Sequence, residues 1–79
     1  MMKVSKLCNK DVVDIKSACK LGRIKDVDID IESGKINSFD VVLNLKASNF
    51  FKNKSKIQIL WEDVENIGDE VILVKNKNN

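Results

Sequence analysis

Two adjacent aromatic residues, Phe50 and Phe51, lie in a lysine-rich stretch and have the side chains best suited to recognition chemistry. The pair interrupts the alternation of a strand, so both rings cannot face one interior, and at least one is expected at the surface or against another chain. Aromatic residues in a basic rim are typical of the centre of a protein interface or of a platform for stacked nucleic-acid bases. A third interpretation is an apolar plug that closes the mouth of a barrel. The candidate contact residues of this stretch are Phe50, Phe51, Lys52 and Lys54.

A row of alternating carboxylates from Asp26 to Glu32 has a composition that resembles a calcium loop. An EF-hand loop needs glycine at its sixth position and glutamate at its twelfth. Counted from Asp26, those positions hold Ile31 and Asn37. The β-branched residues between the acids favour a strand. The row is therefore predicted to be a solvated strand face, and no metal site is expected.

The residue types give little support to catalysis. The chain has no histidine to act as a base, and its serines lie in no nucleophile-elbow context. Cys8 and Cys19 are too far apart for a Cys-x-x-Cys pair and are expected as free thiols, small residues of the core. The glycines Gly22, Gly34 and Gly68 are assigned to turns, which leaves no phosphate-binding loop. The sequence predicts a protein that is not an enzyme and that uses no cofactor and no small-molecule substrate.

The element that positions the acidic row is a long β-hairpin over residues 22–45. Apolar and polar residues alternate on both sides of its turn, as in half-buried strands. A three-residue loop, 32–34, sets Val27 opposite Phe39 and keeps both apolar rows on one face. It also gives Gly34 the positive φ that a type I turn with a following bulge requires.

The same register pairs Ile24 with Val42 on the outer face of the hairpin. An apolar pair on that face is a patch that another surface has to cover. Ile24 and Val42 are therefore added to the candidate contact residues.

The rest of the chain shows short elements separated by polar connections. The pattern predicts a helical turn or coil over 5–9, a strand over 11–15, a polar connection over 16–20 and a loop over 46–55. A strand over 56–60, a segment over 61–64 that can form one helical turn, and a closing hairpin over 65–74 follow. About six short antiparallel strands with no long helix indicate an all-β fold, a small barrel without exposed edges. Trp61 is expected in its core as a large filler. One domain is predicted over residues 1–75, followed by a flexible polar tail over 76–79.

Composition places the chain among small globular domains. Its 79 residues include 14 basic and 12 acidic side chains, a net charge of +2 that is too weak to indicate nucleic-acid binding by itself. No apolar run approaches the roughly 20 residues of a membrane span, and the first residues lack a signal-peptide core. A cytoplasmic protein is expected.

Three stretches together resemble a PRC-barrel domain: Leu21-Gly22-Arg23-Ile24-Lys25-Asp26-Val27, Glu32-Ser33-Gly34-Lys35-Ile36, and the segment 61–74 that begins Trp61-Glu62-Asp63. This small barrel is named for the photosynthetic reaction centre H subunit and is shared by the C-terminal domain of the ribosome maturation factor RimM. The short form with a Phe-Phe excursion is similar to the YlmC/YmxH group of sporulation-associated proteins. Two positions depart from the family pattern: Leu60 replaces a usual proline, and Asn9-Lys10 replaces a glycine near the first turn.

The resemblance implies a non-catalytic adaptor that binds a protein partner, with a homodimer as one form of that contact. It also raises an alternative, an RNA- or ribosome-associated module. The near-neutral charge and the acidic row count against RNA. Docking to a membrane surface would need more positive charge or a lipid signal, and it ranks last.

Overall fold

The computed structural model describes residues 4–75, so the predicted tail over 76–79 lies outside the described residues. In chain order the elements are α1 (Val4–Cys8), β1 (Asp11–Asp14), β2 (Cys19–Ile29), β3 (Ile36–Leu43), α2 (Leu45–Phe50), β4 (Lys56–Leu60), the 3-10 turn η1 (Trp61–Asp63), β5 (Val64–Ile67) and β6 (Val71–Val74). The predicted first strand, the strand over 56–60, the closing hairpin and both helical turns are confirmed.

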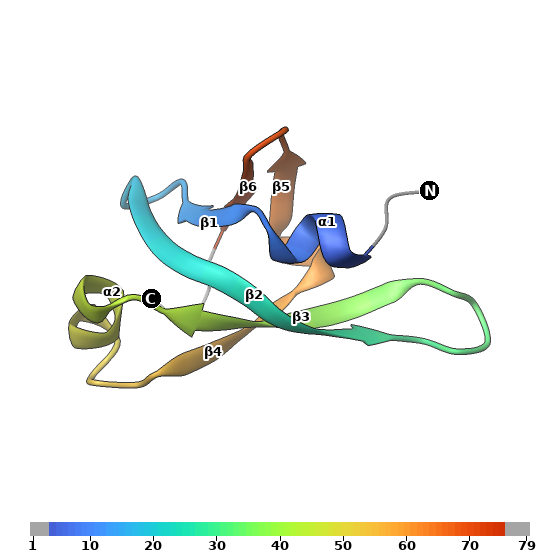
Figure 1. Cartoon of the computed structure of the whole chain (residues 1–79), viewed down its shortest axis with the longest axis horizontal. Coiled ribbons are helices and arrows are strands. Elements are labelled where there is room, and N and C mark those ends of the chain that lie inside the picture. The colour runs from blue at the N-terminus through green and yellow to red at the C-terminus, as the bar shows by residue number, and fades with distance from the viewer. Residues whose placement is uncertain (1–3, 76–79) are drawn as a thin grey trace.

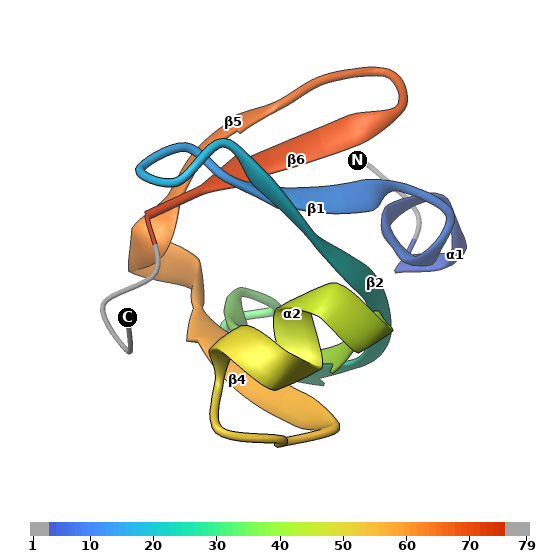
Figure 2. The same cartoon turned by 90° about the vertical axis from the view of Figure 1, so that its left-hand side faces the viewer.

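The strands form one curled sheet in the order β4-β3-β2-β1-β6-β5. Figure 2 shows the sheet bending round an interior like half of a barrel, while η1 connects the two edge strands β4 and β5. Neighbouring strands are antiparallel except β1 and β6, which are parallel. The predicted small β-barrel architecture is confirmed, and this parallel pair is the exception to the predicted antiparallel order. Within residues 4–75 the sheet begins at β4 and ends at β5, so it keeps two edges that the expectation of a barrel without exposed edges did not include.

The hairpin of β2 and β3 has the predicted register at its centre, where Val27 lies opposite Phe39. Nearer its base, a bulge at Lys25 inserts one residue into β2 and shifts the partners. Ile24 therefore lies opposite Val41 and points into the core, with 4% of its surface exposed. The predicted outer pair of Ile24 with Val42 is wrong. Val42 lies on the outer face, exposed, opposite Arg23.

The connection at the far end of the hairpin is one residue longer than predicted. Asp30 N–H donates to the Lys35 carbonyl at 2.8 Å, and Gly34 N–H donates to the Asp30 carbonyl at 2.7 Å. A second bulge, at Asn37, compensates for the longer loop and restores the register at the hairpin centre. Gly34 has the predicted left-handed conformation, with φ of 71°. Ile31 in this loop exposes 95% of its surface. The apolar row that was predicted to face the core therefore continues past the edge of the core.

Buried apolar side chains from β1, β2, β3, β4 and β6 fill the concave side of the sheet, together with residues of the two helices. The largest fully buried apolar residues are Phe39, Leu21, Ile59, Ile72, Val12, Val41 and Val74. Trp61 is exposed rather than a core filler, because η1 holds it at the end of β4. Cys8 and Cys19 are free and half-buried, and Cys8 packs against the core.

Part of the segment predicted as a loop over 46–55 forms the helix α2. The Asn44 side chain accepts a hydrogen bond from Ala47 N–H at 2.8 Å and so caps the first turn. Ala47 and Phe51 are buried and fix the helix against the end of the sheet. Figure 1 shows α2 at one end of the long axis of the molecule, opposite the β2–β3 loop.

Candidate interaction site

The aromatic pair divides between the core and the surface. Phe51 exposes 8% of its surface and packs in the core, whereas Phe50 exposes 53%. Their ring centroids lie 5.3 Å apart with a tilt of 45°. The plug interpretation therefore describes Phe51, and the surface interpretation describes Phe50.

Phe50 belongs to an exposed surface that we name the α2 surface, formed by Leu45, Lys46, Phe50, Lys52 and Lys54. Leu45, the first residue of the helix, exposes 80% of its surface. Lys46 lies four residues before Phe50, on the same side of the helix. Leu45 lies on a different side of the helix from Phe50, because five residues turn the helix by about 140°. Phe50 is thus the aromatic side chain that has exposed lysines near it along the chain.

Backbone geometry after the helix directs the chain back into β4. Lys52 and Asn53 have φ of 57° and 63°, a left-handed conformation. Asn53 N–H donates to the Ser48 carbonyl at 2.7 Å, and Lys54 N–H donates to the Phe51 carbonyl at 3.2 Å. These bonds hold the loop lysines next to the helix end, so the α2 surface has a defined shape.

The helix is also attached to the sheet at its first turn. Asn44 Nδ2 donates to the Lys20 carbonyl of β2 at 2.8 Å, and Asn44 N–H donates to the Leu21 carbonyl at 2.8 Å. One residue therefore caps the helix and joins it to β2. The side chains of the α2 surface stand on a fixed base.

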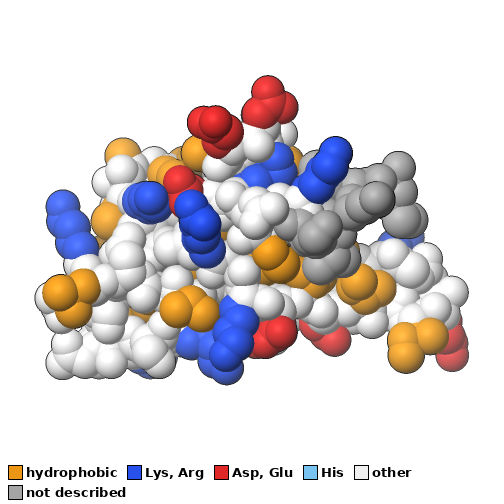
Figure 3. Space-filling view, in the orientation of Figure 1, with side chains coloured by type: hydrophobic (Ala, Val, Ile, Leu, Met, Phe, Trp, Pro, Cys, Tyr) orange, Lys and Arg blue, Asp and Glu red, His pale blue; other side chains and the backbone are white. Residues whose placement is uncertain are grey.

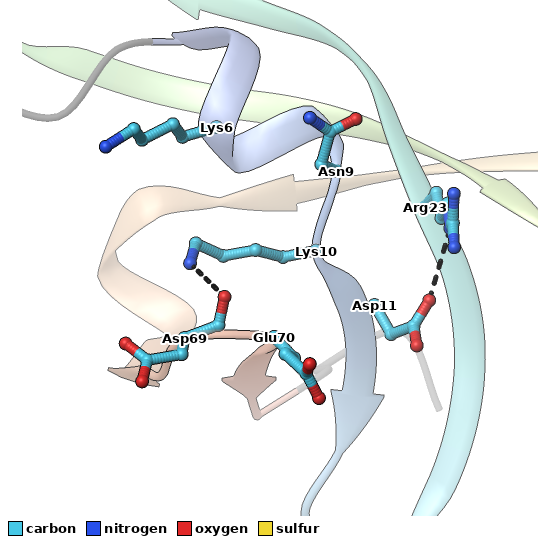
Figure 4. A pocket seen from close by; sticks show the side chains of 7 residues that line it. All are labelled: Lys6, Asn9, Lys10, Asp11, Arg23, Asp69 and Glu70. Carbon is cyan, nitrogen blue, oxygen red and sulfur yellow. Dashed lines mark hydrogen bonds and ion pairs between the residues drawn. The ribbon is translucent and has the colours of Figure 1, made fainter.

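A hollow of about 520 Å³ opens between α1, β1, β2 and the β5–β6 turn. Figure 4 shows its lining residues: Lys6, Asn9, Lys10, Asp11, Arg23, Asp69 and Glu70. Lys10 Nζ donates to the Gly68 and Asp69 carbonyls, both at 2.7 Å, and is largely buried. Lys10 therefore joins the start of β1 to the last turn. Sequence reasoning missed this hollow because its residues come from separate segments with no shared spacing.

Asp11 is held by two cations on the same side of the sheet. Arg23 Nε lies 3.2 Å from Asp11 Oδ1, and Lys20 Nζ lies 3.3 Å from Oδ2. Desolvation acts to raise the pKa of the Asp11 carboxyl, but the hydrogen bonds and charges of Arg23 and Lys20 outweigh it and lower the pKa below 3.8. These side chains bind one another, and the hollow is best understood as a junction between strands.

The predicted acidic row is exposed along β2 and the following loop, which confirms a solvated strand face. Asp26 lies opposite Asp40 across the two strands, so the one carboxylate of β3 adds to those of β2. Within residues 4–75, no group of three or more histidine, cysteine, aspartate or glutamate side chains is arranged to hold a metal ion.

Comparison with protein families gives a decisive match, because the PRC-barrel domain model covers residues 1–78. The chain belongs to the PRC-barrel family. It is 37% identical over 75 residues to the "Probable sporulation protein YlmC" of Bacillus subtilis (strain 168), covering 95% of this chain and 93% of that protein. An uncharacterized protein of Clostridium acetobutylicum is 36% identical over 75 residues, covering 95% of this chain and 85% of its own. The uncharacterized protein YmxH of Bacillus subtilis is 29% identical over 75 residues, covering 92% and 87%.

In this PRC-barrel chain, the predicted contact residues separate into three places. Phe50, Lys52 and Lys54 lie together on the α2 surface, and Phe51 supports them from the core. Ile24 belongs to the core, and Val42 lies on the outer face of the sheet. Leu45 was missed, because alternation assigned it to the buried row of a strand. None of the helices within residues 4–75 is long and apolar enough to cross a bilayer.

Proposed function

We propose that this PRC-barrel protein is a non-catalytic adaptor that binds a protein partner through the α2 surface. The observation that carries the proposal is the exposure of Phe50 and Leu45 on a capped helix, bordered by lysines. Exposed aromatic side chains on a rigid base are common energetic centres of protein interfaces.

A role in sporulation is supported by the similarity to a probable sporulation protein of Bacillus subtilis. The proposed place of action is the cytoplasm. The proposal assigns the chain no catalytic role. The lack of a histidine supports it, as do the bonds that Lys10, Asp11 and Arg23 of the charged hollow make within the protein.

The test is affinity capture of the tagged protein from sporulating cells, in parallel with a Phe50→Ser variant. Phe51 is left unchanged because it belongs to the core. A Leu60→Ser variant is the matched control, since Leu60 is an exposed apolar residue of β4 outside the α2 surface. A protein partner that is lost with Phe50→Ser and kept with Leu60→Ser supports the proposal. Equal recovery by both variants contradicts it.

RNA binding is the second candidate, because an exposed Phe50 among lysines also suits base stacking. The exposed acidic row opposes it. Nuclease treatment of the captured material separates the candidates. Recovery that depends on RNA, falls steeply with salt and is weakened by Lys52→Glu/Lys54→Glu favours RNA, whereas nuclease-resistant recovery favours the protein partner.

A further inference from the structure

The two ends of the molecule carry opposite charges. Residues 26–40, which we name the hairpin end, contain five carboxylates and one lysine, Lys35. Residues 44–56, which include the α2 surface, contain four lysines and no acidic residue. Figure 1 shows these segments at opposite ends of the longest axis, which measures 36 Å. The net charge of +2 conceals this separation of charge.

Each end also presents exposed apolar side chains. Ile31 is almost fully exposed in the β2–β3 loop, next to the exposed Ile29. Leu45 and Phe50 are exposed at the other end. The space-filling view in Figure 3 shows apolar and acidic side chains together at one end, and apolar and basic side chains at the other. The two ends are complementary in charge, and both expose apolar side chains.

We propose that the hairpin end of one copy docks on the α2 surface of a second copy, head to tail. The inference rests on the proposed function of the α2 surface and names its occupant. Ile31 supplies the apolar contact to Phe50, while the carboxylates of the hairpin end face the lysines. A contact between two like ends would bring like charges together, so charge disfavours a symmetric dimer through either end.

Such an interface is heterologous, because two different surfaces meet. The two surfaces lie at opposite ends of the molecule and cannot meet within one copy. Each bound copy leaves one hairpin end and one α2 surface available, so association continues into short chains or a ring. Each contact is small and charged, and we expect weak binding that salt weakens further.

Sedimentation velocity on the purified full chain tests the charge pairing. We expect the average mass to rise above 9.0 kDa with concentration, and association to weaken at least about tenfold between about 50 mM and about 500 mM NaCl. Reversing the charge of one end, by Asp28→Lys/Asp30→Lys or by Lys52→Glu/Lys54→Glu, is expected to abolish association. A chain that carries all four substitutions is expected to associate again, because its two ends again have opposite charges. Glu65→Lys/Glu70→Lys is the control, since it reverses two exposed carboxylates outside both ends.

A mixing experiment tests the head-to-tail arrangement. Ile31→Glu retains a native α2 surface, and Phe50→Glu retains a native hairpin end. Each variant is expected to stay monomeric alone, whereas an equimolar mixture forms a one-to-one pair through the single intact contact. Both residues are exposed, and a circular dichroism spectrum like that of the original chain verifies the fold.

Several results would overturn the inference: a wild-type chain that stays at 9.0 kDa at every concentration, a mixture no heavier than its components, or an Ile31→Glu variant that associates like the wild type. The last result, with Phe50→Glu monomeric, would indicate a symmetric contact between α2 surfaces. Failure here leaves the capture experiment unaffected, because a different protein can still be lost with Phe50→Ser. If neither self-association nor the capture of a partner depends on Phe50, the α2 surface is not a contact site.

Discussion

Gly22 is the residue at which the fold tolerates no side chain. It lies within β2 rather than in a turn, with φ of 155°, and a Cβ placed there would overlap the carbonyl oxygen of Val42. We predict that Gly22→Ala lowers the free energy of unfolding by at least about 3 kcal/mol, measured by urea denaturation. Gly68→Ala is the control, because a Cβ there meets Val71 only at ordinary contact distance, 3.5 Å. Similar losses in both variants would contradict this explanation.

Asp11 makes stability depend on pH at the acid end of the range. Its pKa is lowered below 3.8 in the folded chain by Arg23 and Lys20, so the stabilisation is complete above 3.8 and is lost as pH falls through the lowered pKa. We predict that Asp11→Asn is less stable than the original chain at neutral pH. In urea titrations at a series of pH values, that difference should shrink once the pH falls below 3.8. A difference that does not change with pH would show that the ion pairs do not cause it.

Asn44 connects two elements, since it caps α2 and also bonds to β2. We predict that Asn44→Ala lowers the free energy of unfolding by about 1 to 2 kcal/mol. Asn44→Asp retains the acceptor for Ala47 N–H and loses the donor to Lys20, so it separates the two contributions. If Asn44→Ala has no effect in thermal unfolding followed by circular dichroism, α2 is held by packing alone.

The β2–β3 hairpin shows how far sequence patterning predicts this fold. The alternation of apolar and polar residues correctly predicted the two strands and the pairing of Val27 with Phe39, because a half-buried strand must keep one face apolar. The bulges have no composition signature in this chain, so Ile24 was assigned to the wrong face. The helix α2 was hidden because its six residues are too few to show a helical period, although Asn44 is a good cap.

The candidate site could be predicted only in part from the sequence. Adjacent Phe50 and Phe51 implied that one ring is exposed, but the sequence does not show which one. The packing of α2 against the sheet decides it, and that packing depends on contacts distant along the chain. The opposite charges of the two segments are visible in the sequence, whereas their positions at opposite ends follow from the length of the hairpin.

Across the whole molecule, order is expected to decrease toward the hairpin end. Val12 and Val41 lie in paired strands and belong to the core, while residues 29–35 extend beyond it. We predict slow amide hydrogen exchange at Val12 and Val41 and exchange at least about a hundredfold faster at Ile31, Glu32 and Ser33 in a dilute monomeric sample. Equal protection of the loop would mean that it packs on another surface even when dilute.

The parallel pairing of β1 with β6 joins the first and last strands that the structure describes. Within this domain, β1 is the first of the described strands to be synthesised and its partner β6 is the last. The β2–β3 hairpin can form during synthesis, but the edge of β1 stays open until β6 emerges. The sheet is therefore completed only when its last strand is available, and a truncation before Val71 would leave an unpaired edge of β1 that could pair with other chains.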